Sequence, residues 1–269
     1  PFLAAAAMAV SLTAAAQDEE LIPLWGEPAA TSDVPVNETP DVWFVELNSS
    51  PAADGTSLSA LTTEHQGFRS KASKAGIKFE ERFAFKTLWN GFSIRIAPDQ
   101  LARLQRLEGV KAIYPVIEIF PDEATGDGEA GPELATALNM TGATFAQNTL
   151  GLTGAGVRVA VMDTGIDWNH PDLGGCFGSG CRVVTGHDFV GDAYTGPGST
   201  QVPDNDPDDC GGHGSHVAGI LGASPAAPGG ARGVAPGVTF GAYRVFGCAG
   251  STSSDIMIPA MERALADGM

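Results

Sequence analysis

Residues 157–162 form an almost uninterrupted apolar run that is bounded by turns. A strand with apolar side chains on both faces is typical of a parallel sheet that helices cover on both sides. A helical pattern follows at residues 214–221, a second buried strand at 238–246 and a second helix at 253–266. Because strands alternate with helices, residues 134–269 are predicted to form a doubly wound α/β domain.

A smaller unit precedes this domain. Strand-like and helix-like patterns alternate in the order β-α-β-β-α-β, at residues 41–47, 57–75, 78–85, 93–96, 98–107 and 110–120. This order predicts a small α+β ferredoxin-like domain over residues 41–120. Many unrelated domains share the order, so its position carries more weight. A compact unit directly before a larger domain is a candidate propeptide, and an ordinary accessory domain is the alternative.

The remaining segments are expected to be leaders and linkers. Residues 1–16 combine an apolar run with small residues, which is typical of the later part of a secretory signal peptide without its basic start. The run is too short for a membrane span. Residues 17–40 are expected to be a linker, and residues 121–133 a connector in which a processing cut would fall. We therefore expect a secreted protein whose chain is truncated at both ends.

The charge excludes one class of partner. The formal net charge is −17, and nucleic-acid binding needs a basic surface. The acidic run at residues 204–209 is interpreted as a solvated loop, with a calcium site as the less favoured alternative. Potential glycosylation sequons occur at Asn37, Asn48 and Asn139, and they matter only if the source glycosylates secreted proteins.

All four cysteines lie in the second half of the chain, at Cys176, Cys181, Cys210 and Cys248. A secreted protein folds in an oxidising compartment, so disulfides are expected. Four cysteines allow three connectivities. The short loop between Cys176 and Cys181 favours their pairing, which leaves Cys210 with Cys248.

Two residues stand where catalytic groups are often found. Asp163 ends the apolar strand, the position at which open α/β sheets place their ligands, although a turn or cap role is an alternative. His213 lies between glycines at the start of a helix. Glycines let other backbone approach closely, and a helix N-terminus disfavours a charged imidazole. This setting suits a neutral general base.

His216 follows three residues after His213, so a zinc site must be considered. Cys210 lies nearby, but zinc signatures supply further ligands at fixed spacing, and Cys210 is expected in a disulfide. A zinc-dependent hydrolase that uses His213 and His216 is therefore the second hypothesis. A non-catalytic inhibitor or binding module is the third.

Two segments resemble a known family. Residues 159–167 (Val-Ala-Val-Met-Asp-Thr-Gly-Ile-Asp) and 170–173 (His-Pro-Asp-Leu) resemble the aspartate motif of subtilisin-like peptidases, the subtilase or peptidase S8 family. Residues 212–219 (Gly-His-Gly-Ser-His-Val-Ala-Gly) resemble the histidine motif. Further similarity lies in residues 233–236 and 243–246, and residues 41–120 resemble the inhibitory I9-type propeptide. Two motifs in this order make a specific match.

The resemblance implies a secreted serine endopeptidase precursor that hydrolyses peptide bonds in proteins or peptides and is inhibited by its own propeptide. Asp163 and His213 would be two members of an Asp-His-Ser triad, in which His213 accepts the proton of the attacking serine and Asp163 fixes the imidazole tautomer. Gly250 and Ser251 would bind the backbone of the substrate, which would pair with this segment as an added strand. The family would give His216, His170 and His187 structural roles.

The departures from the family concern the nucleophile and a metal. No Gly-Thr-Ser-Met-type segment, oxyanion asparagine or specificity-pocket strand occurs in these residues. Since loss of the serine costs about a millionfold in turnover, this fragment alone is expected to be inactive. The resemblance requires no cofactor. Some members bind a structural calcium at the position of Asp172, but the partner loop at residues 223–232 contains no asparagine or acid.

Overall fold

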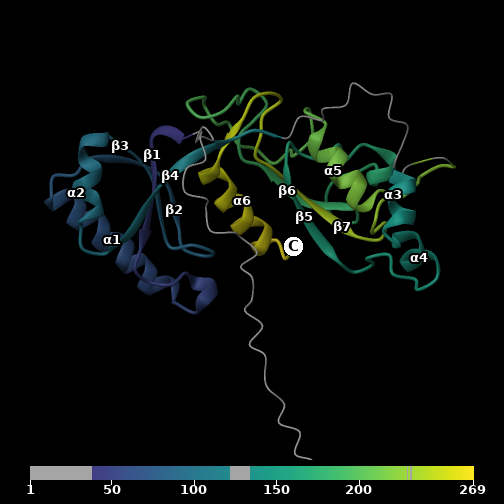
Figure 1. The fold of residues 1–269 in the computed structure, drawn as a ribbon, viewed down its shortest axis with the longest axis horizontal. Helices are drawn as coiled ribbons and strands as arrows, with labels where there is room; N and C mark the ends of the chain where they lie inside the picture. Colours follow the sequence, from purple (N-terminus) through teal and green to yellow (C-terminus); the bar gives the residue numbers. More distant parts are fainter. Residues whose placement is uncertain (1–37, 122–133, 229, 231) are drawn as a thin grey trace, which may run out of the picture. The chain divides into compact units, whose positions relative to one another are not determined.

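The computed structural model describes residues 38–121, 134–228, 230 and 232–269, which fall within one compact unit, Val36–Met269 (Figure 1). The expected signal peptide and most residues of the two expected linkers lie outside the described residues. None of the described helices has the length and apolar character needed to cross a bilayer.

Residues 38–119 form the predicted α+β unit. Its elements are β1 (Glu38–Leu47), α1 (Leu58–Lys74), β2 (Phe79–Phe85), β3 (Gly91–Ile96), α2 (Leu101–Gln105) and β4 (Val110–Ile119). The strands lie in the order β2-β3-β1-β4, and every pair is antiparallel. This is the topology that the β-α-β-β-α-β order predicts.

Helix α1 covers one face of this sheet. Ser57 accepts the N–H of Ala60 and so satisfies one of the free donors at the helix start. Leu61, Phe68 and Ala72 are buried at helical spacing, and they belong to the apolar stripe that faces the sheet. Short 3-10 turns, Ala52–Asp54 and Pro98–Gln100, join the remaining elements.

The second half of the chain is built on a parallel sheet. Its elements are α3 (Leu134–Met140), α4 (Ala143–Asn148), β5 (Arg158–Asp163), the 3-10 turn Pro171–Leu173, β6 (Val183–Asp188), α5 (His213–Gly222), β7 (Thr239–Arg244), β8 (Thr252–Ser253) and α6 (Ser254–Ala266). The strand order is β5-β7-β6, and both pairs are parallel.

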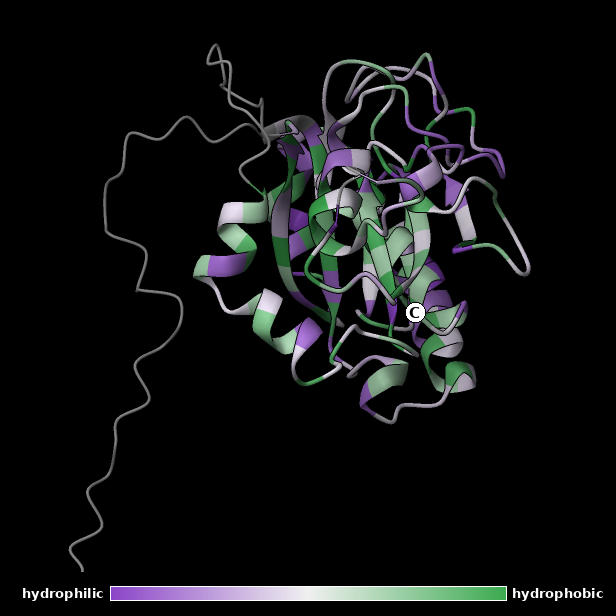
Figure 2. Cartoon of the chain, turned by 90° about the vertical axis from the view of Figure 1, so that its right-hand side faces the viewer, coloured by the Kyte–Doolittle hydropathy of each residue, from purple (hydrophilic) through white to green (hydrophobic). Residues whose placement is uncertain are grey.

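Alternate residues of β7 enter two different cores. Phe240 and Ala242 pack with Ala218 of α5, whereas Tyr243 packs with Ile256 and Ala260 of α6. Since successive strand side chains point to opposite faces, α5 and α6 cover the two faces of the sheet, as a doubly wound fold requires. Figure 2 shows largely hydrophobic residues (green) along the strands and helices in the middle of the molecule.

Two strands and a helix break were not predicted. Strand β6 contains Gly186-His187-Asp188 and has no apolar run, yet a Cβ at Gly186 would lie 2.2 Å from the carbonyl oxygen of Ala242, so only glycine fits there. Helices α3 and α4 are separated at Gly142, which has φ of 76°. Strand β8 exists through its pairing with β4.

The β4–β8 pair joins the two sheet systems. Glu118 pairs with Ser253 and Ile119 with Thr252, in antiparallel register. Helix α6 follows β8 directly and contacts β2 and β4 as well as β5 and β7, so it lies between the two sheets (Figure 1).

Candidate active site

Asp163 and His213 meet at the carboxyl end of the parallel sheet. Asp163 is the last residue of β5, and His213 is the first residue of α5. The Nδ1 atom of His213 lies 2.8 Å from Oδ1 and 2.9 Å from Oδ2 of Asp163. A carboxylate only accepts hydrogen bonds, so Nδ1 carries the proton and Nε2 is left as the acceptor. The imidazole is 30% exposed, and the carboxylate is 13% exposed.

Glycines allow the two motifs to approach this closely. A Cβ at Gly214 would lie 2.1 Å from the carbonyl oxygen of Gly165, which no side chain tolerates. Gly212, the residue before α5, has φ of 84°, in the left-handed region that favours glycine. Packing against the turn after Asp163 therefore explains the glycine after the histidine, and the backbone conformation explains the glycine before it.

An open cavity of about 510 Å³ lies beside His213. It is lined by Pro121, Thr164, Gly211, Gly212, His213, His216, Phe246, Gly247, Cys248, Ala249 and Gly250. Of the two residues predicted to bind substrate, Gly250 lines this cavity. Ser251 does not line it, because it is buried with its backbone N–H bonded to Thr195 and its hydroxyl bonded to Glu118 of β4.

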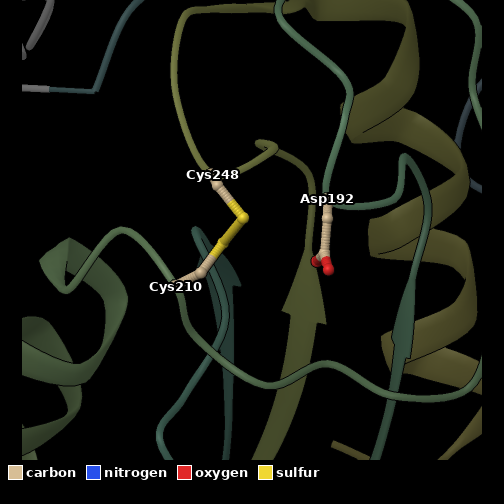
Figure 3. Close-up of side chains that lie close together, drawn as sticks. All are labelled: Asp192, Cys210 and Cys248. Carbon is tan, nitrogen blue, oxygen red and sulfur yellow. A yellow bond between two sulfur atoms is a disulfide. The ribbon is translucent and has the colours of Figure 1, made fainter.

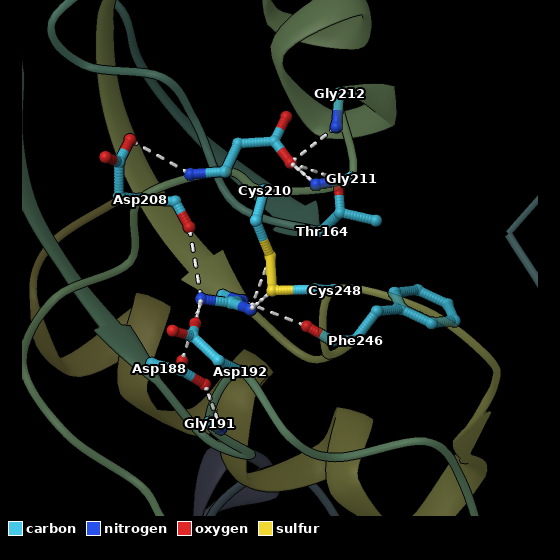
Figure 4. Close-up of a disulfide and its surroundings, with 12 residues drawn as sticks. Thr164, Asp188, Gly191, Asp192, Asp208, Cys210, Gly211, Gly212, Phe246 and Cys248 are labelled. Carbon is cyan, nitrogen blue, oxygen red and sulfur yellow. Dashed lines mark hydrogen bonds and ion pairs between the residues drawn. A yellow bond between two sulfur atoms is a disulfide. The ribbon is translucent and has the colours of Figure 1, made fainter.

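The disulfides join the pairs that loop length favoured, Cys176–Cys181 and Cys210–Cys248. The second joins Cys210, three residues before His213, to Cys248, two residues before Gly250. Figure 4 shows this disulfide with Gly211 and Gly212 following it toward α5. It therefore connects two walls of the cavity.

Buried Arg244 lies beside this disulfide. Its guanidinium donates to the sulfur of Cys210 at 2.9 Å and to Asp192 at 2.6 Å, and it lies 3.3 Å from the carboxylate of Asp188. Burial raises the pKa of Asp188, while the N–H groups of Gly191 and Val190 oppose that change. These contacts anchor the end of β7 beside the disulfide.

One group of three potential metal ligands occurs among the described residues, namely Asp192, Cys210 and Cys248 (Figure 3). The two sulfur atoms are bonded to each other, so neither is a thiolate ligand. His213 and His216 belong to no such group in the described part of the chain. His213 uses Nδ1 on Asp163, and His216 is exposed one turn later.

At the position suggested for calcium, Asp172 makes hydrogen bonds with the described part of the loop after α5. Oδ1 of Asp172 accepts the N–H of Ala226, from the loop that would have supplied the other ligands. The carbonyl oxygen of Asp172 accepts the N–H of Ser224. Both of these contacts present N–H groups to Asp172, whereas calcium takes oxygen ligands. Asp172 therefore ties the loop after α5 to the 3-10 turn Pro171–Leu173.

The other two histidines of the second half of the chain, His170 and His187, make local contacts. Nδ1 of His170 accepts the N–H of Asp172 at 3.2 Å, which caps the 3-10 turn. His187 lies in β6, with Nδ1 3.2 Å from Asn205. Neither residue lines the cavity beside His213.

Sequence reasoning missed Asp209, which was placed in a solvated acidic loop. Its carboxylate accepts hydrogen bonds from Thr164 and from the start of α5, including the hydroxyl of Ser215 at 2.6 Å. Burial would raise the pKa of Asp209, but the hydrogen bonds from Ser215, Gly212 and Thr164 outweigh it and lower the pKa. The available signal was an aspartate four residues before the histidine, followed by two glycines.

The chain is similar to known proteins over most of its described length. Residues 154–269 match the model of the subtilase family, Peptidase_S8. The minor extracellular protease Vpr of Bacillus subtilis is 34% identical over 224 residues, which cover 81% of this chain and 26% of Vpr. Subtilisin-like protease 6 of Arthroderma gypseum is 39% identical over 112 residues, which cover 42% of this chain and 21% of that protein.

A solved structure has the same fold. The epidermin leader peptide processing serine protease EpiP from Staphylococcus aureus aligns with a TM-score of 0.53 and 21% identity, covering 84% of this chain and 47% of EpiP. The matched region spans only about a fifth to a quarter of the curated relatives' own length.

Proposed function

Because the chain belongs to the subtilase family, we propose that it is the amino-terminal part of a secreted serine endopeptidase precursor. In this proposal residues 1–16 are part of a signal peptide, 17–40 a linker, 41–120 a propeptide, 121–133 a processing linker and 134–269 the first part of the catalytic domain. The extracellular relative Vpr supports secretion.

One observation carries the proposal: Nδ1 of His213 bonds the carboxylate of Asp163 at 2.8 Å, next to an open cavity. In the mechanism, Nε2 of His213 accepts the proton of a serine hydroxyl as its oxygen attacks the peptide carbonyl. His213 then donates that proton to the leaving amine. Asp163 holds the imidazole in this tautomer and stabilises its charged form.

The serine is not among these residues, because they contain no Gly-Thr-Ser-Met-type segment. Ser215 is unsuited to the role, since its hydroxyl donates to Asp209 and accepts the N–H of Asp167. We therefore propose that residues 1–269 alone do not hydrolyse peptides.

Contacts of β4 support an inhibitory role for the first unit. Its residues Glu118 and Ile119 pair with β8 as an added strand, and Pro121 lines the same cavity as His213. An extended peptide on a sheet edge is a common way to bind peptide substrates. The propeptide would thus exclude substrate by occupying the edge of β8, the strand that directly follows Gly250 and Ser251 in the chain.

Two residues of α6 also hold this unit. Oε1 of Glu262 accepts the N–H groups of Thr87 at 2.9 Å and Leu88 at 3.1 Å. Near the other end of α6, Asp255 pairs with Arg82 at 2.7 Å. These charge-assisted bonds support a specific complex between the propeptide and the catalytic part.

The experiment expresses the protein encoded by the whole reading frame and measures hydrolysis of a peptide substrate with and without a zinc chelator. Asp163→Asn is expected to lower kcat by about four orders of magnitude, because the imidazole loses the partner that fixes its tautomer. The chelator should have no effect. Chelator-sensitive hydrolysis that survives Asp163→Asn would favour the zinc hydrolase.

A further inference from the structure

We propose that Asp209 is a positioning residue, which sets the placement of His213 against Asp163 by binding the start of α5 and the turn after β5 at once. The catalytic part of this inference rests on the proposed function. The structural part concerns only the described residues.

The first set of contacts reaches α5. Oδ1 of Asp209 accepts the N–H groups of Gly211 and Gly212, both at 2.8 Å, and Oδ2 accepts the N–H of Ser215 at 2.9 Å. The first N–H groups of a helix have no partner within the helix, and a side chain at the cap position usually satisfies one of them. Gly212 occupies that position and has no side chain. Asp209 supplies the cap for the helix that begins with His213.

The second set of contacts reaches the aspartate motif. The hydroxyl of Thr164, the residue after Asp163, donates to Oδ1 of Asp209 at 2.9 Å and accepts the N–H of Gly214 at 2.8 Å. The hydroxyl of Ser215 donates to Oδ2 at 2.6 Å and accepts the N–H of Asp167 at 2.8 Å. Both hydroxyls therefore donate their protons to the carboxylate of Asp209. In addition, the Thr164 hydroxyl oxygen accepts a backbone N–H of α5, and the Ser215 hydroxyl oxygen accepts a backbone N–H of the aspartate motif.

A carboxylate is the group that this arrangement requires. Three N–H groups and two hydroxyls donate to Asp209, and an ionised carboxylate is a pure acceptor with about four lone-pair sites. An asparagine would turn an NH₂ group toward some of these donors. Replacing one carboxylate oxygen by an NH₂ group would therefore weaken the two hydroxyl links as well as the helix cap, because all five hydrogen bonds end on the two oxygens of Asp209.

The consequence is geometric. His213 reaches Asp163 only because the first turn of α5 is fixed against the end of β5. A misplacement of about 1 Å at a reacting group can cost about a hundredfold in rate. Removal of Asp209 should therefore lower kcat while it leaves substrate binding largely unchanged.

The test compares Asp209→Asn with a matched control, Asp208→Asn. Each variant removes one negative charge from the same loop, but the carboxylate of Asp208 accepts the N–H of Asp209 and is not bonded to α5 in the described structure. In the complete enzyme, Asp209→Asn should lower kcat about a hundredfold with KM changed by no more than about threefold. Asp208→Asn should stay within about twofold of the parent protein.

A spectroscopic arm uses the 269-residue chain and needs no hydrolysis. The strongly deshielded proton NMR signal of the His213 Nδ1–H, bonded to Asp163, should be present in the parent chain and in Asp208→Asn and be lost or shifted in Asp209→Asn. Equal effects of the two variants on this signal or on kcat would overturn the inference, because charge alone would then explain them.

Folding is checked by near-ultraviolet circular dichroism. If Asp209→Asn does not fold, Thr164→Val and Ser215→Ala each remove one hydroxyl link, and each should lower kcat about tenfold and shift the Nδ1 signal. Parent-like values in both would overturn the inference. If the complete protein hydrolyses no peptide at all, the proposed function fails, and the NMR comparison still decides the role of Asp209.

Discussion

Arg82 and Asp255, which are 173 positions apart in the chain, form an ion pair whose carboxylate is fully buried. Arg82 lies on β2 and Asp255 in the first turn of α6, with Nε 2.7 Å from Oδ2. The hydroxyls of Ser93 and Ser253 donate to the same carboxylate at 2.5 and 2.6 Å. One hydrogen-bonded network therefore spans the α+β unit and the helix that supports the parallel sheet.

Arg82→Leu should lower the free energy of unfolding by about 3–5 kcal/mol, because it leaves a buried carboxylate without its cation. The matched control is Arg95→Leu, whose partner Glu80 is 3.9 Å away in a pair exposed by 41% and 73%. An exposed pair contributes about 0–1 kcal/mol. Urea unfolding measures the free energy of unfolding of both variants. Equal losses of that free energy would show that the buried Arg82–Asp255 pair contributes no more to stability than the exposed pair.

His65 should make stability depend on pH. It is fully buried, Nε2 lies 2.9 Å from Oδ1 of Asn90, and Nδ1 has no hydrogen-bond partner among the residues that the structure describes. Burial lowers the pKa of His65 below its ordinary 6.5, although the bond to Asn90 opposes this. Protonation therefore favours the unfolded chain, and stability falls as pH falls below the unfolded value.

His65→Gln keeps a donor for Asn90 but does not titrate. Its loss of stability between about pH 7 and about pH 5 should be smaller than that of the parent chain, as read from urea midpoints. The assignment fails if His65→Gln loses as much stability as the parent over this range.

The two disulfides should differ in their contributions. The Cys210–Cys248 bridge closes 38 positions, and the Cys176–Cys181 bridge closes five. Loop-closure entropy then predicts that replacing both cysteines by alanine costs about 4 kcal/mol at the first bridge and about 2 kcal/mol at the second. Thermal and denaturant unfolding of the two double variants tests this, and the reverse order would contradict the loop-length argument.

The fold was largely predictable where local pattern and tertiary contact agree. The apolar run of β5 and the helical spacing of α1 depend on which faces are buried, and this is written in the sequence. Strands β6 and β8 were missed for a different reason. Strand β6 depends on the close packing of Gly186 against Ala242 of β7, and β8 depends on pairing with the edge of β4. These partners are distant in the chain, so the local sequence of β6 and β8 does not indicate a strand.

The residues of the candidate site also differ in whether the local sequence or a distant contact reveals them. Asp163 and His213 could be found because one ends a buried strand and the other begins a helix between glycines. Asp209 looked like one acid among several in a loop. Its role depends on the hydroxyl of Thr164, 45 positions earlier, which only the folded chain brings within 2.9 Å.

The most direct test of the central claim is labelling of the complete protein with a fluorophosphonate probe, which reacts with an activated serine. We expect the parent protein to be labelled, His213→Ala to lose the label, and His216→Ala to keep it, because in the described structure Asp163 is bonded to His213 and not to His216. A parent protein that is not labelled, or labelling that survives in His213→Ala, would contradict the assignment of Asp163 and His213 to a serine peptidase triad.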